Sequence, residues 1–488
     1  MDDELLELLC TWKLEDVADD LANEGYTQVK ELEEDLPEAA VTDLQVGQKY
    51  KNRLRNLLTH LHVTHQKREE KERQNSTDVQ QALGQMRATP SSAQVQREVC
   101  KELETLAEND PDKRIEIAAE GGFLVVIVTM TAHKGDAEML VQGCGMLTNL
   151  AVNDDIVIAI VDAGGMTVLL SVMKMHRGHA EVQKHGCGAL RNLSVHDNNR
   201  IAIAADGGIA VLLAAMKAHR GRAEVQKHGC GALMHLSNND NEQIAIVADG
   251  GIPVLLAAMK VHRGHTEVQQ LGCGALRNLS RNDNNKVAIA ANVSILVLLA
   301  AIKAHMGHAE VQQLGCGALR NLSCNNNNKI SITADGGIPV LLAAMKAHFG
   351  HAEVQEHGCG ALRKLSCNDN NKIAIAADRG IPVLLAAMKA HMGHAEVQEK
   401  GCGALGKLSN TDNSTMAIAV DGGIPVLLAA MKAHKGNAKV QEHGCFALGI
   451  IGWPDTTLQT CIKDEGGVAV LQATVAASGA TADCKEFG

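Results

Sequence analysis

A ten-residue stretch, HGCGALRNLS, begins at His185, and a nearly identical stretch, LGCGALRNLS, begins at Leu271 and again at Leu314. Repeated cysteines could serve as redox-active thiols or as metal ligands. Zinc needs four ligands around one ion, whereas each cysteine here is alone in its repeat, and neighbouring helices lie roughly 10 Å apart. We therefore predict buried thiols that pack as small apolar groups. The cysteines recur every 43 residues, as Cys144, Cys187, Cys230, Cys273, Cys316, Cys359, Cys402 and Cys445.

Histidines form a second repeated pattern, in which two imidazoles stand three residues apart. Two imidazoles could hold a metal ion weakly, but no cysteine or carboxylate stands at a third-ligand spacing. A histidine near the C-terminus of a helix also interacts favourably with the helix dipole. We predict no specific metal site and no cofactor. The pairs are His176/His179, His262/His265, His305/His308, His348/His351 and His391/His394.

The sequence carries none of the local motifs that identify common enzyme classes. It has no phosphate-binding glycine loop, no GxSxG nucleophile motif and no kinase signature. An active site would interrupt the repeat, and the interruptions are few: ANVSI around Val293, DRG around Arg379, and Phe446. We predict a non-enzymatic protein with no catalytic residues.

Each repeat divides into three predicted helices. In the unit that starts at Asn198, NNRIAIAADGGI predicts a short helix that ends at a glycine pair, because glycine readily adopts the left-handed turn after a helix. GIAVLLAAMKAH predicts a second helix, and HAEVQKHGCGALRNLS, from the preceding unit, predicts a longer third helix. Turns rich in Asn and Asp then close the unit. Proline at the first turn of the second helix fits this division; it is found as Pro253, Pro339, Pro382 and Pro425.

The third helix has two different faces. At 100° per residue, Cys187 falls on one side, and Arg191 and Asn192 fall on the opposite side. The cysteine side is predicted to pack into the stack and the other side to point outward. Glycine inside a helix costs about 1 kcal/mol relative to alanine. Close helix packing at Gly186 and the approach of a ligand backbone at Gly188 are both open explanations for this cost.

The 43-residue period, the short first helix with its glycine pair and the GALRNLS-like third helix together resemble the armadillo repeat family. The HEAT repeat is the nearest alternative, but it lacks the extra short helix. The resemblance implies an all-α, right-handed α-solenoid of about eight full three-helix repeats with partial caps, spanning residues 92–478. Residues 479–488 are predicted to be a flexible tail.

In armadillo proteins the third helices line a concave groove in which an asparagine holds the backbone of an extended peptide. The resemblance assigns this role to Asn149, Asn192, Asn278 and Asn321. Family members such as importin-α place a tryptophan four residues before this asparagine. Seven units here carry glycine at that position, and the eighth carries Phe446 without the asparagine. Capture of basic signals in the manner of importin-α is therefore not expected.

Arginine precedes the asparagine position in four units, as Arg191, Arg277, Arg320 and Arg363. These side chains could pair with acidic groups or phosphates of a partner, so we expect replacement of Arg277 and Arg320 by glutamate to abolish partner binding without unfolding. Eight residues before the asparagine position, the side chains pass from basic to neutral to acidic after the first unit. A polarised groove and drift within duplicated units are both open explanations. The column reads Val141, Lys184, Lys227, Gln270, Gln313, Glu356, Glu399 and Glu442.

The first part of the chain differs from the repeats. Residues 1–62 resemble a SAM (sterile alpha motif) domain, because Trp12 and EDVADDL open a helix and TDLQVGQKYKNRLRNLL closes the segment. The resemblance implies a small helical bundle that associates head to tail through acidic and basic faces; ordinary solvated charges explain the same residues equally well. Residues 63–91 are predicted to form a charged helix and a linker.

Composition limits the location and the partners. Of the formal net charge of −11, −9 falls between Met1 and Leu61, and the chain has eight aromatic residues. A nearly neutral body with few aromatic side chains makes nucleic-acid binding improbable. No apolar run reaches membrane-spanning length, and the beginning MDDELLELLC does not look like a secretory signal. We expect a protein of the cytoplasm or the nucleus, with reduced thiols.

These patterns favour a non-enzymatic scaffold or adaptor for protein–protein interactions in signalling. Its groove is predicted to bind an extended protein or peptide segment with acidic or phosphorylated residues, while the SAM-like domain self-associates or recruits a partner. An alternative is a nuclear-transport or signalling receptor, similar to importin-α or β-catenin, that reads one defined peptide motif. A third class, a regulator of an enzyme, would act on a catalytic domain that this sequence does not contain.

Overall fold

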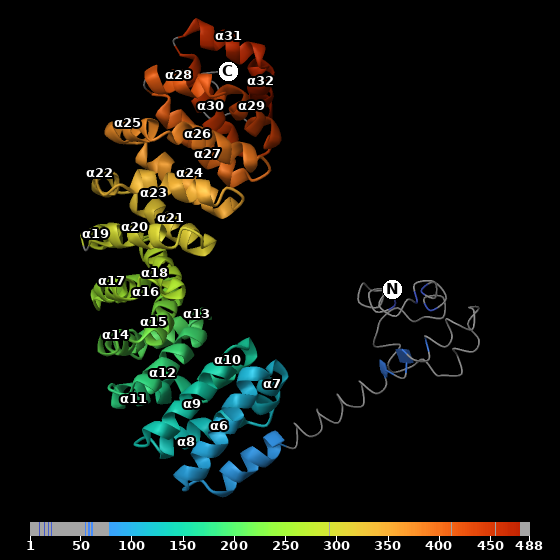
Figure 1. Cartoon of the computed structure of the whole chain (residues 1–488), viewed down its shortest axis with the longest axis vertical. Coiled ribbons are helices and arrows are strands. Elements are labelled where there is room, and N and C mark those ends of the chain that lie inside the picture. Colours follow the sequence, from blue (N-terminus) through green and yellow to red (C-terminus); the bar gives the residue numbers. More distant parts are fainter. Residues whose placement is uncertain are drawn as a thin grey trace. The chain divides into compact units, whose positions relative to one another are not determined.

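The computed structural model describes residues 78–478 apart from 292, 411 and 454, together with a few isolated positions before residue 78. These residues form helices and contain no strand, as predicted (Figure 1). The chain divides into two compact units, Met1–Val125 and Val126–Gly488, and the division falls within helix α8 (Gly122–Ala132).

The first unit contains a helix over residues 78–88, then α6 (Ala93–Asn109) and α7 (Pro111–Ala119). Ser92, which follows the predicted linker, caps α6 by accepting a hydrogen bond from the Val95 N–H. The SAM-like prediction for residues 1–62 lies outside the described residues, apart from isolated positions, and so do residues 63–77 and the tail 479–488. Several of the isolated positions are buried leucines: Leu9, Leu14, Leu21, Leu54, Leu57, Leu58 and Leu61.

The second unit repeats the three predicted helices. The first helices are α10 (Asp154–Asp162), α13 (Asp197–Ala205), α16 (Asp240–Ala248), α19 (Asp283–Ala290), α22 (Asn326–Ala334), α25 (Asp369–Ala377), α28 (Asp412–Val420) and α31 (Thr456–Asp464). The second helices after α8 are α11 (Gly165–Met175), α14 (Gly208–Ala218), α17 (Gly251–Val261), α20 (Ser294–Ala304), α23 (Gly337–Ala347), α26 (Gly380–Ala390), α29 (Gly423–Ala433) and α32 (Gly467–Ser478). The third helices are α9 (Ala137–Leu150), α12 (Ala180–Leu193), α15 (Ala223–Leu236), α18 (Thr266–Leu279), α21 (Ala309–Leu322), α24 (Ala352–Leu365), α27 (Ala395–Leu408) and α30 (Ala438–Gly452).

Local sequence explains where these helices begin and end. The residue between the first and second helices adopts the left-handed conformation, as at Gly207 with φ of 76°, which confirms the predicted role of the glycine pair. The Asn-rich stretches cap the first helices: the Asn153 side chain accepts hydrogen bonds from the N–H groups of Asp155 and Ile156. Val293 and Arg379 adopt the same left-handed conformation without being glycine.

Two kinds of side-chain hydrogen bond recur at the ends of the second helices. One comes from the third helix of the same repeat, and the other reaches the preceding repeat. Gln183 donates from Nε2 to the carbonyl oxygens of Met173 and His176, which satisfies the C-terminal end of α11. The His176 Nε2 lies 2.7 Å from the Lys134 carbonyl oxygen in the preceding repeat. The same interaction joins each following pair of repeats, through His219, His262, His305, His348, His391 and His434. The first histidine of each His-x-x-His pair is therefore part of the framework.

The third helices of successive repeats pack against one another far more extensively than the second helices do. The cysteine column lies in this packed layer with no exposed surface, which confirms the predicted inward orientation. Burial raises the pKa of Cys187 and of Cys316 to about 12, so both remain protonated thiols at neutral pH. The column is thus a part of the core.

Thiol-specific reagents are expected to distinguish two classes of cysteine. Cys324, Cys367 and Cys461 are exposed, whereas the other described cysteines are buried. Because the thiolate is the reactive form, the exposed thiols should react within minutes at about pH 8 and the buried ones only after denaturation. Peptide mapping by mass spectrometry after labelling of the native protein checks this. Labelling of Cys187 at the same rate as Cys324 would contradict the orientation of the column.

No single helix in the described part of the chain has both the length and the apolarity needed to cross a membrane. Seven pairs of consecutive helices, each sharply bent at the joint, pass that test by length and composition when the two helices are taken together.

Candidate partner-binding groove

The structure places all ten predicted groove residues on one series of third helices, where each is half-buried. Arg191 and Asn192 lie at the C-terminal end of α12, and Lys184 lies two turns earlier on the same helix. The other residues occupy equivalent places: Asn149 on α9, Lys227 on α15, Arg277 and Asn278 on α18, Arg320 and Asn321 on α21, and Arg363 on α24. We call this series of surfaces the third-helix face.

The asparagines of this face connect neighbouring repeats. Asn192 donates from Nδ2 to the Thr148 carbonyl oxygen at 2.9 Å, and Asn321 donates to the Arg277 carbonyl oxygen at 3.0 Å. Asn278 makes the same bond to Met234 and a second bond to Asn238. The Oδ1 atoms of these three asparagines accept no hydrogen bond within the described part of the chain, so they can still accept one from a ligand N–H.

The glycines that replace the tryptophan of importin-α make room for the preceding repeat. A Cβ atom added to Gly360 would lie 2.9 Å from Arg320 Cδ, so the arginine crosses α24 where a larger residue would stand. The last pair reverses the sizes: a Cβ atom on Gly406 would lie 2.7 Å from Phe446 Cδ1. The remaining large-on-small pairs are Thr148 with Gly188, Arg191 with Gly231, Met234 with Gly274, Arg277 with Gly317, and Arg363 with Gly403.

The glycine two residues earlier, on the other side of the third helix, has a different neighbour. A Cβ atom added to Gly186 would lie 2.7 Å from both Cγ and Sδ of Met173, which belongs to the second helix of the same repeat. Both glycine columns therefore allow close packing within the chain, which supports the packing explanation at Gly186 and extends it to the column of Gly188.

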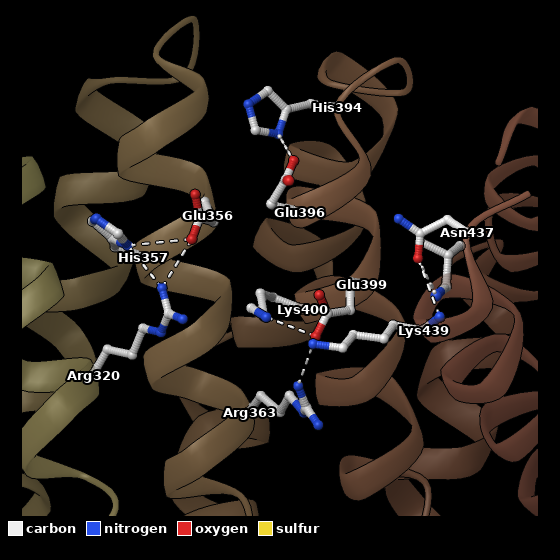
Figure 2. Close-up of polar contacts among 11 residues, drawn as sticks. Arg320, Glu356, His357, Arg363, His394, Glu396, Glu399, Lys400, Asn437 and Lys439 are labelled. Atoms are coloured by element: carbon white, nitrogen blue, oxygen red, sulfur yellow. Dashed lines mark hydrogen bonds and ion pairs between the residues drawn. The ribbon is translucent and has the colours of Figure 1, made fainter.

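Two of the four arginines pair with glutamates of the following repeat (Figure 2). Arg320 Nη1 lies 2.9 Å from Glu356 Oε1 and 3.1 Å from His357 Nδ1. Arg363 Nη1 lies 3.4 Å from Glu399 Oε1, which also accepts a hydrogen bond from Lys400 at 2.6 Å. Glu356 and Glu399, two acidic residues of the column that passes from basic to acidic, thus neutralise the arginines next to them.

Arg191 and Arg277 have no ion pair among the described residues. Burial, followed by the charge of Arg320, lowers the pKa of Arg277, although Glu356 acts in the opposite direction. A guanidinium that is partly desolvated and has no carboxylate partner is a favourable place for an anionic group of a ligand. Lys184 is less able to bind an anionic ligand group, because it already pairs with Glu181 on its own helix.

Four histidines of this face were not predicted as functional residues. Burial lowers the pKa of His185, His228 and His443 to about 4, and burial together with Arg277, Arg320 and Lys400 lowers that of His357 to about 3. Each stands directly before a Gly-Cys pair, and this regular position is the sequence signal that could have identified them. They are uncharged at neutral pH.

The described residues contain no cluster of three or more His, Cys, Asp or Glu side chains arranged to hold a metal ion. The second histidines of the His-x-x-His pairs stand at the N-caps of third helices, as His179 does when its Nδ1 accepts a hydrogen bond from the Val182 N–H. The first histidine of each pair therefore has a structural partner in the preceding repeat. Of the second histidines, His179 alone makes a side-chain cap hydrogen bond, whereas His265, His308, His351 and His394 stand at N-caps without one.

Comparison with solved structures supports the fold. An engineered protein matches with a TM-score of 0.72 and 28% identity, covering 84% of this chain and all of the other. A structure from a study of a phosphorylation switch in the interaction between cadherin and beta-catenin matches with a TM-score of 0.61 and 16% identity. It covers 84% of this chain and 91% of the other. The second similarity concerns the fold alone. No curated protein matches.

A family model described as the LRRK2 ARM repeat matches residues 39–207 and 205–336, which is more than half of the chain. The matched residues include part of the first unit and the helices from α6 to α22. No catalytic family matches. Together with the repeated three-helix units, this shows that the chain belongs to the LRRK2 ARM repeat family.

Proposed function

We propose that the protein is a non-enzymatic scaffold or adaptor whose third-helix face binds an extended segment of a partner protein. The observation that carries this proposal is a set of half-buried polar groups on this face that have no partner among the described residues: the Oδ1 atoms of Asn192, Asn278 and Asn321 and the guanidinium groups of Arg191 and Arg277. The Oδ1 atoms of Asn192 and Asn321 can accept hydrogen bonds from a peptide backbone, which would fix the path of an extended ligand.

The partner segment is proposed to carry acidic or phosphorylated residues. Arg191 and Arg277 would hold these groups, since each guanidinium lacks an acidic partner within the described residues. Arg320 and Arg363 already have glutamate partners, so they would contribute less. The ligand is therefore expected to place its acidic end near α12 to α18.

Recognition of a basic signal in the manner of importin-α receives no support from this geometry. The aliphatic part of Arg320 occupies the space next to Gly360 where that family places tryptophan. We also propose that residues 1–62 mediate self-association or recruit a second partner. Size-exclusion chromatography with multi-angle light scattering, on the full chain and on a variant lacking these residues, tests this part of the proposal.

Charge reversal tests the groove. In the full chain, Arg191→Glu combined with Arg277→Glu is expected to weaken partner binding at least tenfold, because two attractive contacts become repulsive. The partner is first isolated with the wild-type chain and then titrated against each variant by calorimetry. The matched control is Lys303→Glu with Lys389→Glu, which reverses the same number of charges on exposed positions of second helices.

Circular dichroism establishes that the variants are folded. Affinity unchanged by the arginine substitutions, or reduced equally by the lysine substitutions, would contradict binding on the third-helix face.

A further inference from the structure

A cavity of about 270 Å³ lies between the second helices α17 and α20, and its lining also includes Gln269 of α18 but none of the ten residues of the third-helix face. Met259, Val293, Leu296 and Ala300 form much of its apolar wall, and Lys260 and Arg263 also line it. A cavity of about 150 Å³ can hold a benzene ring, so this one has room for a large apolar side chain.

The preceding repeat junction has a smaller counterpart. Between α14 and α17 the cavity is about 80 Å³, and its lining includes Met216, Lys217, Arg220, Pro253 and Ala257. Each of these residues stands 43 positions before a residue of the larger cavity.

Two substitutions in the repeat distinguish the larger cavity. Leu296 stands where the preceding repeat has Pro253, and Val293 stands where it has Gly250. Both aliphatic side chains line the larger cavity. The interruption of the repeat noted in the sequence is thus a local change in the shape of the second-helix surface.

Val293 adopts the left-handed conformation with φ of 56°, which is unfavourable for a β-branched residue. Packing does not compensate for this strain, because Val293 is 50% exposed and Leu296 is 49% exposed. Glycine stands at the equivalent position in most other repeats. Strained, exposed apolar residues beside a cavity are typical of a binding site.

The charge beside the cavity is positive. Lys260 and Arg263 are exposed and form no ion pair with any described residue. Lys217 and Arg220 repeat this arrangement at the smaller cavity one junction earlier. A ligand for this surface therefore combines an apolar group with negative charges.

We propose that the cavity between α17 and α20 anchors a short acidic segment of a partner protein, which inserts one leucine or phenylalanine side chain and places carboxylates against Lys260 and Arg263. This surface is separate from the third-helix face, so it provides the chain with a second contact for a partner. One large side chain fits the volume, and the cations select a carboxylate beside it.

A fluorescent acidic peptide of ten residues with one central phenylalanine serves as the probe, measured by anisotropy with the full chain. Ala300→Phe fills the cavity from an exposed position and is expected to weaken binding at least tenfold. Ala343→Phe makes the same change one repeat later, also at an exposed position, and should leave binding unchanged. Lys260→Glu with Arg263→Glu should also abolish binding, and a peptide with serine in place of phenylalanine should not bind.

Val293→Gly separates a role of Val293 in binding from a role in stability, because the two properties are expected to change in opposite directions. It removes the strained conformation and should raise the unfolding midpoint, yet it should weaken probe binding because part of the cavity wall is lost. A variant that is more stable and binds the probe normally would overturn the role of Val293 in the site.

The other outcomes are also decisive. Failure of the probe to bind the wild-type chain at about 1 mM, or equal binding by Ala300→Phe, overturns the proposal. Loss of binding in Arg277→Glu but not in Ala300→Phe would place the probe on the third-helix face. Binding of oleate that Ala300→Phe abolishes, without binding of the peptide, would assign the cavity to a lipid. Failure of the groove proposal alone leaves these results unchanged.

Discussion

The free energy of unfolding of the second unit, which contains the repeats, is expected to fall by several kcal/mol between about pH 7 and about pH 5. The pKa values of His185, His228, His357 and His443 are lowered to about 4, 4, 3 and 4, whereas an unfolded histidine titrates near 6.5. Between these values the unfolded chain binds more protons than the folded chain, so stability is fully present above pH 6.5 and is lost as the pH falls. Each histidine contributes at most about 1.4 kcal/mol per pH unit.

The carboxylates do not account for a loss in this range. Glu181, Glu224 and Glu399 have pKa values below their usual 4.5, so their protonation affects stability only at lower pH. Guanidinium denaturation at about pH 7, 6 and 5 measures the effect. His357→Leu is the matched variant, because leucine occupies the same position in two repeats, as Leu271 and Leu314. It should flatten the pH dependence, and an unchanged slope would contradict the role of His357.

Gly358→Ala is expected to lower the unfolding free energy by about 2 kcal/mol. A Cβ atom there would lie 2.5 Å from Met345 Cγ, and Met345 is 1% exposed, so neither group has space to move. Overpacking of this kind typically costs about 1–3 kcal/mol, and the strong overlap exceeds the gain of about 1 kcal/mol in helix propensity. Denaturation of the full chain, followed by tryptophan fluorescence and circular dichroism, gives the difference.

Gly360→Ala is the control, two residues later on the same helix. Its Cβ atom would lie 2.9 Å from Arg320 Cδ, but the Arg320 side chain is 28% exposed and can move outward. The clash and the gain in helix propensity should nearly cancel, so this variant is expected within about 1 kcal/mol of the wild type. Equal losses in the two variants would show that the glycines do not serve different neighbours.

The 43-residue period predicted most of the fold. Each repeat carries the same signals at the same positions, so the glycine at the left-handed joint and the inward cysteine follow from a single unit. Val293 and Arg379 could be identified as departures because the joint requires a left-handed residue. The three helices of each repeat and their order could therefore be predicted from local sequence patterns.

The contacts between repeats could not be predicted from the sequence in the same way. The Arg320–Glu356 pair depends on the lateral offset of two third helices, and one sequence does not reveal that offset. His176 contacts a backbone carbonyl, which leaves no trace in the residue types around it. The crossing of Gly360 by Arg320 likewise depends on the direction of a side chain in the preceding repeat.

The most direct test of the account maps a partner segment along the third-helix face. A photo-cross-linking amino acid is placed, one site at a time, at Lys184, Gln270 or Glu442, which are half-buried positions that leave the four arginines intact. Lys303 and Lys389 on second helices serve as control sites. Repeats lie roughly 10 Å apart and an extended chain advances about 3.3 Å per residue, so each repeat corresponds to about three ligand residues.

Lys184 and Gln270 are two repeats apart, and Gln270 and Glu442 are four repeats apart. The account predicts cross-links to partner residues in a single direction, separated by about six and then about twelve positions. Cross-links in no consistent order, or equally strong cross-links to that segment from Lys303 and Lys389, would contradict the binding of an extended segment along the third-helix face.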